Sequence, residues 1–212
     1  TEEEIRETIL SASIILVSGG NTLYAVERWK ELGIDKLIRQ AASDGAVLCG
    51  GSAGAICWFE EGHSQSLNPA LSLHVDPDLT EEEKQNWEYI RVDGLGFLPG
   101  LCVPHHDVAQ SNGVPRTEDS NEMMKEKPAQ PCVGIDEEAV LVVEGDQVRV
   151  VSAKADATCC VKVCEDTEDG ELEIVSYPFT EEDGAVSIEQ LLADPATVLE
   201  EPETVDDISN NE

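Results

Sequence analysis

The sequence predicts an α/β fold with three layers and a doubly wound, mostly parallel sheet. Short apolar runs rich in β-branched residues, typical of buried strands, alternate with segments of helical periodicity. Breaks rich in glycine, proline or histidine follow three of these runs, at Gly19–Asn21, Gly50–Gly54 and Pro104–His106. Because parallel sheets bind ligands outside the carboxyl ends of their strands, these three breaks predict a functional site.

The composition excludes several classes of protein. A hydrophobic fraction of 41% in 212 residues is ordinary for a globular chain, but the net charge is −32. A field of that sign repels phosphate backbones, which disfavours nucleic-acid binding. No apolar run approaches the roughly 20 residues that a membrane span needs. We therefore expect neither a nucleic acid nor a membrane among the partners.

The seven cysteines include no C-x-x-C pair, and no histidine lies at a familiar zinc spacing from them. Most of them stand in apolar, strand-like surroundings, so we expect buried, reduced thiols and no metal or other cofactor. No signal-peptide pattern is present, and together these features predict a cytoplasmic protein.

Negative charge is concentrated at the C-terminal end. Residues 165–212 contain seventeen acidic residues and no Lys or Arg. The change in composition predicts two parts. The first is the main domain, over residues 1–164, which carries the candidate hydrolase residues, and the second is an acidic, partly disordered extension over residues 165–212. The extension is interpreted as a solvated surface, with salt adaptation or a docking tail as the alternatives.

The N-terminal part alternates helices and strands. Glu2–Ser11 has an acidic first turn, which suits a helix N-terminus. Ser13–Ser18 (SIILVS) predicts a strand buried on both faces, as in a parallel sheet. The elements expected next are helix Thr22–Leu32, stopped by Gly33, a helix capped by Asp35 and reaching Ser43, strand Ala46–Cys49, and helix Ala55–Phe59.

The segment Glu60–Glu88 is polar, is interrupted by Pro69 and Pro77, and is expected to form a loop. Beyond it, strands are expected at Tyr89–Val92, Leu101–Val103, Cys132–Ile135, Ala139–Val143, Gln147–Val151, Thr158–Cys164 and Glu171–Val175, with helices at Thr117–Lys127 and Ser187–Leu192.

The strongest chemical signal is Gly50-Gly51-Ser52-Ala53-Gly54, which stands between a predicted strand and a predicted helix. This is the G-x-S-x-G nucleophile elbow in its required context. A sharp turn lifts the serine side chain clear of the backbone, and the glycines avoid crowding the neighbouring strand and helix. The alternative is a plain glycine-rich turn. The amide of Ala53 would supply one half of an oxyanion hole, and that of Gly20 the other.

A serine nucleophile needs a base, and the chain has four histidines. His63 and His74 stand in the polar segment and are expected to be solvated. His105 follows a strand end, where sites of this fold class gather, and is the favoured base. His106 competes with it, because adjacent residues of an extended chain point in opposite directions.

The third member of a triad would be an acid after the next strand, where Asp136, Glu137 and Glu138 are the candidates. The order Ser, His, acid differs from the order Ser, acid, His of ordinary α/β-hydrolases, which disfavours that fold.

Four pieces of this sequence resemble the peptidase E family of serine peptidases, which contains aspartyl dipeptidases and, more distantly, cyanophycinases. They are Gly19-Gly20-Asn21-Thr22, Gly51-Ser52-Ala53-Gly54-Ala55, Pro104-His105 and Gly134-x-x-Glu137. The resemblance runs from about Glu2 to about Val151. It implies the flavodoxin-like fold of class I glutamine amidotransferases, with a serine in place of their cysteine nucleophile.

The resemblance also implies roles for individual residues. Ser52 matches the nucleophile, His105 the base and Glu137 the third member, while Gly20 and Ala53 match the oxyanion hole. Asn21 and Arg116 are the expected substrate contacts, with Arg116 matching the arginine that binds an aspartate side chain in aspartyl dipeptidases. Arg116 is the only cation between Arg91 and Lys125, and an acidic substrate needs a local positive partner. The alternative interpretation is that Arg116 is a surface arginine with no role in substrate binding.

The chain departs from the family pattern in three places. Family members normally begin with a strand–helix–strand unit ahead of the position of Glu2, and this unit is expected to be lacking here. The residue after the catalytic histidine is usually aromatic, whereas here it is His106. The region 165–212 has no counterpart that can be placed.

The sequence thus predicts a serine peptidase that hydrolyses short peptides through an acyl-enzyme, dipeptidase-like and with a preference for N-terminal aspartate. The alternatives are an amidase-like hydrolase acting on a non-peptide amide, and a non-catalytic binding module of the same fold. The expected partners are a small peptide substrate and, in a homodimer, a second copy of the chain.

Overall fold

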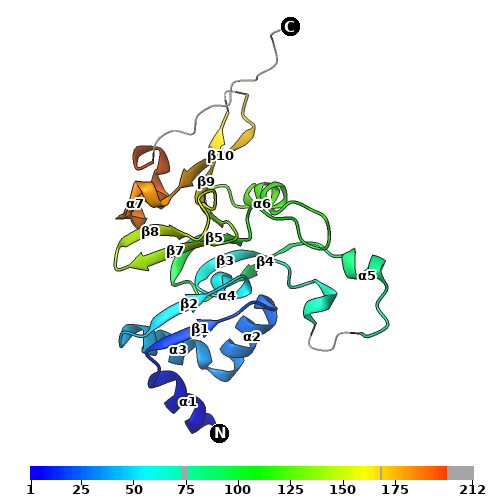
Figure 1. Ribbon diagram of the computed structural model, residues 1–212, viewed down its shortest axis with the longest axis vertical. Helices are drawn as coiled ribbons and strands as arrows, with labels where there is room; N and C mark the ends of the chain where they lie inside the picture. The colour runs from blue at the N-terminus through cyan, green and yellow to red at the C-terminus, as the bar shows by residue number, and fades with distance from the viewer. Residues whose placement is uncertain (73–75, 168, 200–212) are drawn as a thin grey trace.

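The computed structural model describes residues 1–72, 76–167 and 169–199. It is a mixed α/β protein, elongated in Figure 1, with α1, α2 and α3 at the N-terminal end and β9, β10 and α7 at the other. The helices are α1 (Glu2–Leu10), α2 (Thr22–Leu32), α3 (Ile34–Ser43), α4 (Ala53–Ile56), α5 (Glu81–Gln85), α6 (Arg116–Met124) and α7 (Ile188–Ala193), with single 3₁₀ turns at Pro69–Leu71, Glu181–Asp183 and Pro195–Thr197.

The strands form three sheets. They are β1 (Ile14–Val17), β2 (Val47–Gly50), β3 (Phe59–Ser64), β4 (Ile90–Asp93), β5 (Leu98–Pro104), β6 (Cys132–Ile135), β7 (Ala139–Glu144), β8 (Gln147–Ser152), β9 (Cys159–Asp166), β10 (Leu172–Phe179) and β11 (Val186–Ser187). The largest sheet has the order β10-β9-β6-β5-β3-β4. Its central strands β3, β5 and β6 are parallel. Strands β4 and β9 run antiparallel to them, and the edge strand β10 is antiparallel to β9. The predicted α/β class with parallel strands at its centre is confirmed.

The parallel pair β1 and β2 forms a separate small sheet, with Ile14 opposite Val47 and Leu16 opposite Cys49. Helices α2 and α3 cover one face through Val26 and Ile38, which pack with Ile15, Val17 and Leu48. The expectation that the first strand is buried on both faces is wrong. Its other face stays open, and Ile14 and Leu16 are 63% and 73% exposed.

Local signals set the helix ends. Thr1 forms a capping box with Glu4 at the start of α1, and Asn21 caps α2 by accepting a hydrogen bond from the Tyr24 amide. Gly33 ends α2 in the left-handed conformation, φ 71°, and α3 begins at the next residue. The prediction that Asp35 caps this helix is therefore wrong, because Asp35 lies in its first turn, where its charge still suits the helix dipole.

The segment Glu60–Glu88, expected to be a loop, instead contains β3 and α5. Helix α4 is correspondingly shorter than predicted, since Phe59 already belongs to β3. The prediction failed at β3 because its polar residues, which are typical of a loop, find hydrogen-bond and ion-pair partners inside the protein. Glu61, for example, accepts a hydrogen bond from Arg91 at 2.7 Å and pairs with Lys127.

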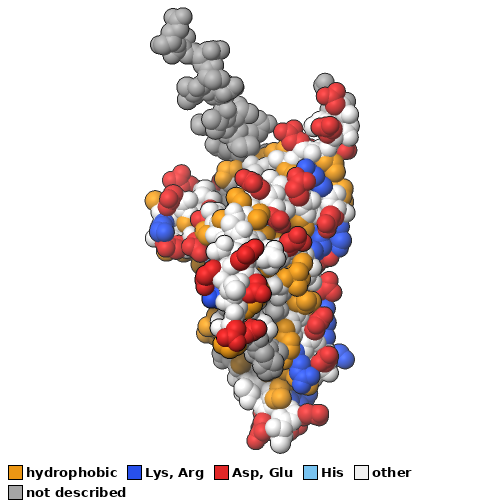
Figure 2. Space-filling model, turned by 90° about the vertical axis from the view of Figure 1, so that its right-hand side faces the viewer, with side chains coloured by type: hydrophobic (Ala, Val, Ile, Leu, Met, Phe, Trp, Pro, Cys, Tyr) orange, Lys and Arg blue, Asp and Glu red, His pale blue; other side chains and the backbone are white. Residues whose placement is uncertain are grey.

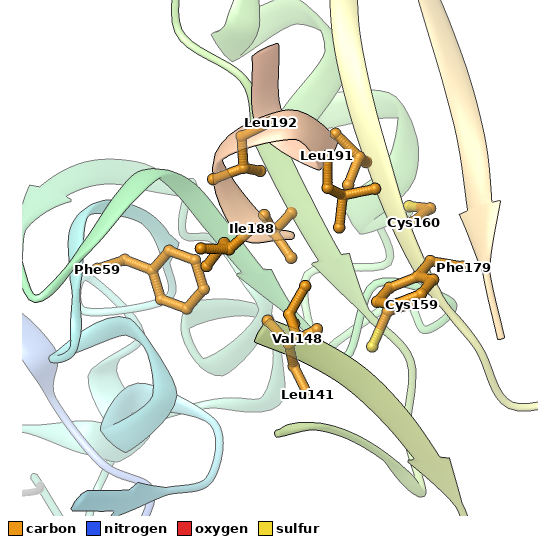
Figure 3. Close-up of a pocket in the computed structure, with 11 residues that line it drawn as sticks. Phe59, Leu141, Val148, Cys159, Cys160, Phe179, Ile188, Leu191 and Leu192 are labelled. Carbon is orange, nitrogen blue, oxygen red and sulfur yellow. The ribbon is translucent and has the colours of Figure 1, made fainter. Parts of the chain in front are cut away.

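The C-terminal elements complete a common core. Strand β9 runs across position 164, the predicted start of the acidic extension, and Tyr177 and Phe179 of β10 are buried against Val148. Figure 3 shows α7 over a small apolar cavity of about 10 Å³, lined by Phe59, Val148 and Leu191 among others. Such a cavity admits at most one water and holds no ligand. Residues 200–212 lie outside the described residues.

The surface carries the excess of acidic residues, which are spread along the visible face in Figure 2. The seven cysteines are all free, and five of them are buried, as expected of structural thiols. No helix of the described part is long and apolar enough to cross a membrane.

Candidate active site

The backbone turns sharply at Ser52, between the end of β2 and the start of α4. Its φ and ψ are 56° and −122°, values that residues with a Cβ rarely adopt. This conformation lifts the side chain away from both flanking elements. The Ser52 hydroxyl makes no capping hydrogen bond to α4, so its oxygen is not used to stabilise the helix.

The glycines around Ser52 are required by close packing. A Cβ at Gly54 would lie 2.0 Å from the carbonyl oxygen of Val17, and one at Gly50 would lie 2.2 Å from the carbonyl oxygen of Gly54. A Cβ at Gly19 would lie 3.3 Å from the Cβ of Ser52. At Gly51 there is open space. The elbow is therefore pressed against the end of β1, as its sequence pattern predicts.

The ends of β5 and β6 carry a histidine–carboxylate pair. His105 follows β5, Glu137 lies just beyond β6, and the distance from His105 Nδ1 to Glu137 Oε1 is 3.0 Å. A carboxylate accepts but does not donate, so this contact requires the proton on Nδ1 and leaves the Nε2 lone pair free to take a proton. His105 is 28% exposed and Glu137 48% exposed, so the pair is open to solvent and to a substrate.

Backbone strain gathers at these same positions. Ser52, His105 and Glu138 are the non-glycine residues with positive φ among those that the structure describes, at 56°, 51° and 68°. Such conformations cost about 1–3 kcal/mol each and persist where the surrounding structure imposes them, often at active sites. Within the described part of the chain, no hydrogen bond joins the Ser52 hydroxyl to His105.

His106, the competing base, has a different environment. Its side chain is 12% exposed, and its Nδ1 lies 3.4 Å from Asp136 Oδ1. Of the other two acidic candidates, Glu138 pairs with Lys154 at 2.9 Å. The prediction that His63 is solvated is wrong, because its side chain is fully buried and its Nε2 lies 2.7 Å from Asp119 Oδ1. His74 lies outside the described residues.

The two proposed oxyanion amides belong to the residue after Ser52 and to the turn after β1. Ala53 directly follows Ser52, and Gly20 belongs to the turn packed against it, with φ 143°. Neither amide donates a hydrogen bond to any described residue. The Asn21 side chain is already engaged, since its Oδ1 caps α2 and its Nδ2 donates to the Ser66 carbonyl at 2.9 Å. Asn21 thereby ties the turn after β1 to the segment after β3.

Arg116 begins α6 and is 1% exposed. Its Nη1 donates to the His63 carbonyl at 3.1 Å, and its Cζ lies 4.9 Å from the centre of the Tyr89 ring. A second cation, Lys162, is equally buried and bonds to Ser120 Oγ and Asn121 Oδ1. Burial and the charges of these two cations lower the pKa of His63 to about 3, so His63 is neutral and donates to Asp119.

The arrangement is chemically suited to acyl transfer. A strained serine, a histidine with a free Nε2, a carboxylate on its Nδ1 and two free amides are the parts that such a reaction needs. In residues 1–72, 76–167 and 169–199, no three His, Cys, Asp or Glu side chains converge as a metal site. Fold and site together define an α/β protein with a strained Gly-Gly-Ser-Ala-Gly turn at the carboxyl end of a parallel strand pair.

The chain belongs to peptidase family S51, whose family model matches residues 1–151. The uncharacterized peptidase YgaJ of Bacillus subtilis is 39% identical over 99 residues, which cover 47% of this chain and 35% of that protein. Peptidase E of Shewanella amazonensis is 28% identical over 152 residues, 70% of this chain and 58% of the relative. The resemblance to the peptidase E family is thereby confirmed.

A solved structure supports the fold. The crystal structure of a peptidase from an acI-B1 Actinobacterium superposes with a TM-score of 0.53 at 18% identity, over 87% of this chain and 63% of that one. The chain thus spans only part of its relatives: its match covers 35% of the length of YgaJ and 58% of the length of the Shewanella amazonensis peptidase E.

Proposed function

We propose that this chain carries the catalytic machinery of a serine peptidase. Ser52 is the nucleophile, His105 the general base and Glu137 the group that orients His105. The observation that carries the proposal is the coincidence of backbone strain with chemistry. Ser52 and His105, the nucleophile and base that the sequence predicts, both have positive φ, and Glu138, which also has positive φ, adjoins the third member.

The reaction follows from the geometry. Ser52 Oγ attacks the scissile carbonyl carbon while its proton passes to His105 Nε2, and the negative oxygen that forms lies between the Gly20 and Ala53 amides. The C–N bond then breaks as His105 returns the proton to the leaving amine. Water repeats the sequence on the acyl-enzyme, releasing the acid and restoring Ser52. Glu137 holds His105 in one tautomer and stabilises its cation.

The substrate we propose is a short peptide, with an acidic residue at its N-terminus. What supports the acidic preference is an excess of buried positive charge. Arg116 and Lys162 are both about 1% exposed, and Asp119 is the carboxylate nearest to Arg116 and His63. Because the Arg116 guanidinium is covered, a substrate carboxylate meets it only if the residues above it move; otherwise the cation acts through its field. Asn21 contributes by fixing the turn that carries Gly20, through its bonds to Tyr24 and Ser66.

Hydrolysis of matched dipeptides tests the proposal. The 212-residue chain should cleave peptides that begin with aspartate faster than peptides that begin with asparagine or leucine, and should leave non-peptide amides intact. Ser52→Ala should abolish turnover while the protein remains folded. Arg116→Ala should reduce kcat/KM for the aspartyl peptide about 10-fold or more and spare the leucyl peptide. An equal loss of kcat/KM on the two peptides would show that Arg116 does not select the substrate.

A further inference from the structure

A second histidine–carboxylate pair lies directly beside the first. His106 follows His105, Asp136 precedes Glu137, and His106 Nδ1 lies 3.4 Å from Asp136 Oδ1. Both pairs join the segment after β5 to the segment after β6. They differ in burial, because the side chains of His106 and Asp136 are 12% and 13% exposed and those of His105 and Glu137 are 28% and 48% exposed. The second pair is therefore the more buried of the two.

His106 is held by its backbone as well as by its ring. Its amide donates to the Ile135 carbonyl at 3.1 Å, and its carbonyl accepts from Thr117 Oγ1 at 2.8 Å. The ring fills the space left by Gly134, where a Cβ would lie 2.8 Å from the His106 Cγ. Cys160 Sγ lies on the same side, 3.8 Å from His106 Nδ1. These contacts give the imidazole a single, closely fitting site.

Asp136 is held as firmly. Its Oδ2 accepts hydrogen bonds from the Thr158 amide at 3.0 Å and the Thr158 hydroxyl at 2.9 Å, and its own amide donates to the Thr158 carbonyl at 3.1 Å. This leaves Oδ1 for His106. The carboxylate thus anchors the segment after β6 to the start of β9 and to His106 at the same time.

The charge state suits a permanent ion pair. Burial lowers the pKa of His106, but the contacts with Asp136 and Cys160 outweigh it and raise the pKa to about 9. The groups that face His106 are the Asp136 carboxylate and the Cys160 thiol, which raise its pKa, and the Lys162 ammonium, which lowers it. At neutral pH His106 is therefore a cation and cannot serve as a base.

The pair acts on residues whose backbones are strained. His105 has φ 51° and Glu138 has φ 68°, and each adjoins the buried pair within two positions in sequence. Such conformations revert unless their flanks are fixed. A third link supports the same register, since Asp107 Oδ1 accepts a hydrogen bond from the Glu137 amide at 2.8 Å.

We propose that His106 and Asp136 are positioning residues, a buried ion pair that sets the separation and orientation of His105 and Glu137 at the active site. The inference rests on the proposed function, because it assigns to His105 and Glu137 the roles given above. Neither His106 nor Asp136 touches the substrate. Their effect on catalysis passes through the placement of the exposed pair, for which errors of about 1 Å cost up to 100-fold in rate.

The test measures how fast a fluorophosphonate probe modifies Ser52, normalised to the folded fraction of each variant. His106→Gln and Asp136→Asn should each slow the modification about 10- to 100-fold. In a His105→Gln background, His106→Gln should have no further effect, because its action passes through His105. His63→Gln is the matched control. It also removes a buried imidazole, but the partner of that ring is Asp119, and its modification rate should stay within twofold of the wild type.

A merely structural role gives a different pattern. His106→Gln would then lower the melting temperature, leave the normalised rate unchanged, and add to the effect of His105→Gln; this pattern would overturn the proposal. Histidine side-chain NMR separates the proposal from the peptidase assignment. If the wild-type chain is not modified at Ser52, the peptidase assignment fails. The positioning role survives only if Asp136→Asn still removes the His105 Nδ1–H resonance that Glu137 protects, and an unchanged resonance would refute it.

Discussion

The strain at Ser52 predicts that removing its side chain stabilises the protein. With φ 56° and ψ −122°, a residue with a Cβ costs about 1–3 kcal/mol here, whereas glycine adopts the conformation freely. Glycine in turn costs about 0.5–1 kcal/mol through the greater freedom of the unfolded chain. Since the Ser52 hydroxyl caps nothing, Ser52→Ala should be nearly neutral. Ser52→Gly should then exceed Ser52→Ala in unfolding free energy by roughly 0.5–2 kcal/mol.

Equilibrium unfolding in urea measures this difference from the two midpoints at equal m-value. Ser120, in the middle of α6, supplies a control with the opposite sign, because there glycine should be about 1 kcal/mol less stable than alanine. Both Ser52 variants should be inactive. A Ser52→Gly protein no more stable than Ser52→Ala would show that the turn is unstrained, and the elbow would lose its physical basis.

Three further predictions concern packing, pH and orientation. Gly54→Ala should cost about 3 kcal/mol or more, because its Cβ meets the Val17 carbonyl at 2.0 Å, while Gly51→Ala, in open space, should shift the melting temperature little; equal shifts would contradict the packing account. The buried His63 has its pKa lowered to about 3, so the unfolded chain binds a proton below pH 6.5 that the folded chain does not. Its contribution to stability is complete above pH 6.5 and is lost as the pH falls, by about 2 kcal/mol at pH 5, and the stability difference between wild type and His63→Gln should change with pH by that amount; a difference independent of pH would mean that folding leaves the pKa of His63 unchanged. Glu137→Gln should lower kcat on the preferred dipeptide roughly 100-fold or more without loss of stability, and an unchanged kcat would show that Glu137 does not orient His105 for catalysis.

The sequence allowed the central strands to be predicted because their apolar runs are short and are bounded by glycine, proline or polar breaks. It failed at β3, where FEEGHS has no apolar periodicity. Its burial depends on partners distant in sequence, such as the pairing of Glu61 with Arg91 and of His63 with Asp119. It also failed at β1, where a fully apolar run predicts two covered faces and only one is covered.

The site residues were predictable to the extent that local sequence encodes them. The elbow is a contiguous motif, and the structure explains its glycines, because a Cβ added at Gly54 or Gly50 would lie only 2.0–2.2 Å from a backbone oxygen. The pairing of His105 with Glu137 depended on where β5 and β6 end. The pairing of His106 with Asp136 was not predicted, although these residues are adjacent in sequence to His105 and Glu137. The local sequence does not show that Gly134 and Cys160 leave space for a second imidazole ring. The burial of Arg116 against Tyr89 is likewise a property of packing alone.

The central claim is that Ser52 is a nucleophile activated by His105. The most direct measurement is the mass and site of the adduct formed when the folded 212-residue chain is treated with a fluorophosphonate. The account predicts a single adduct on Ser52, absent in Ser52→Ala and formed at least 100-fold more slowly in His105→Gln. An adduct on another residue, or a rate on Ser52 that His105→Gln leaves unchanged, would contradict it.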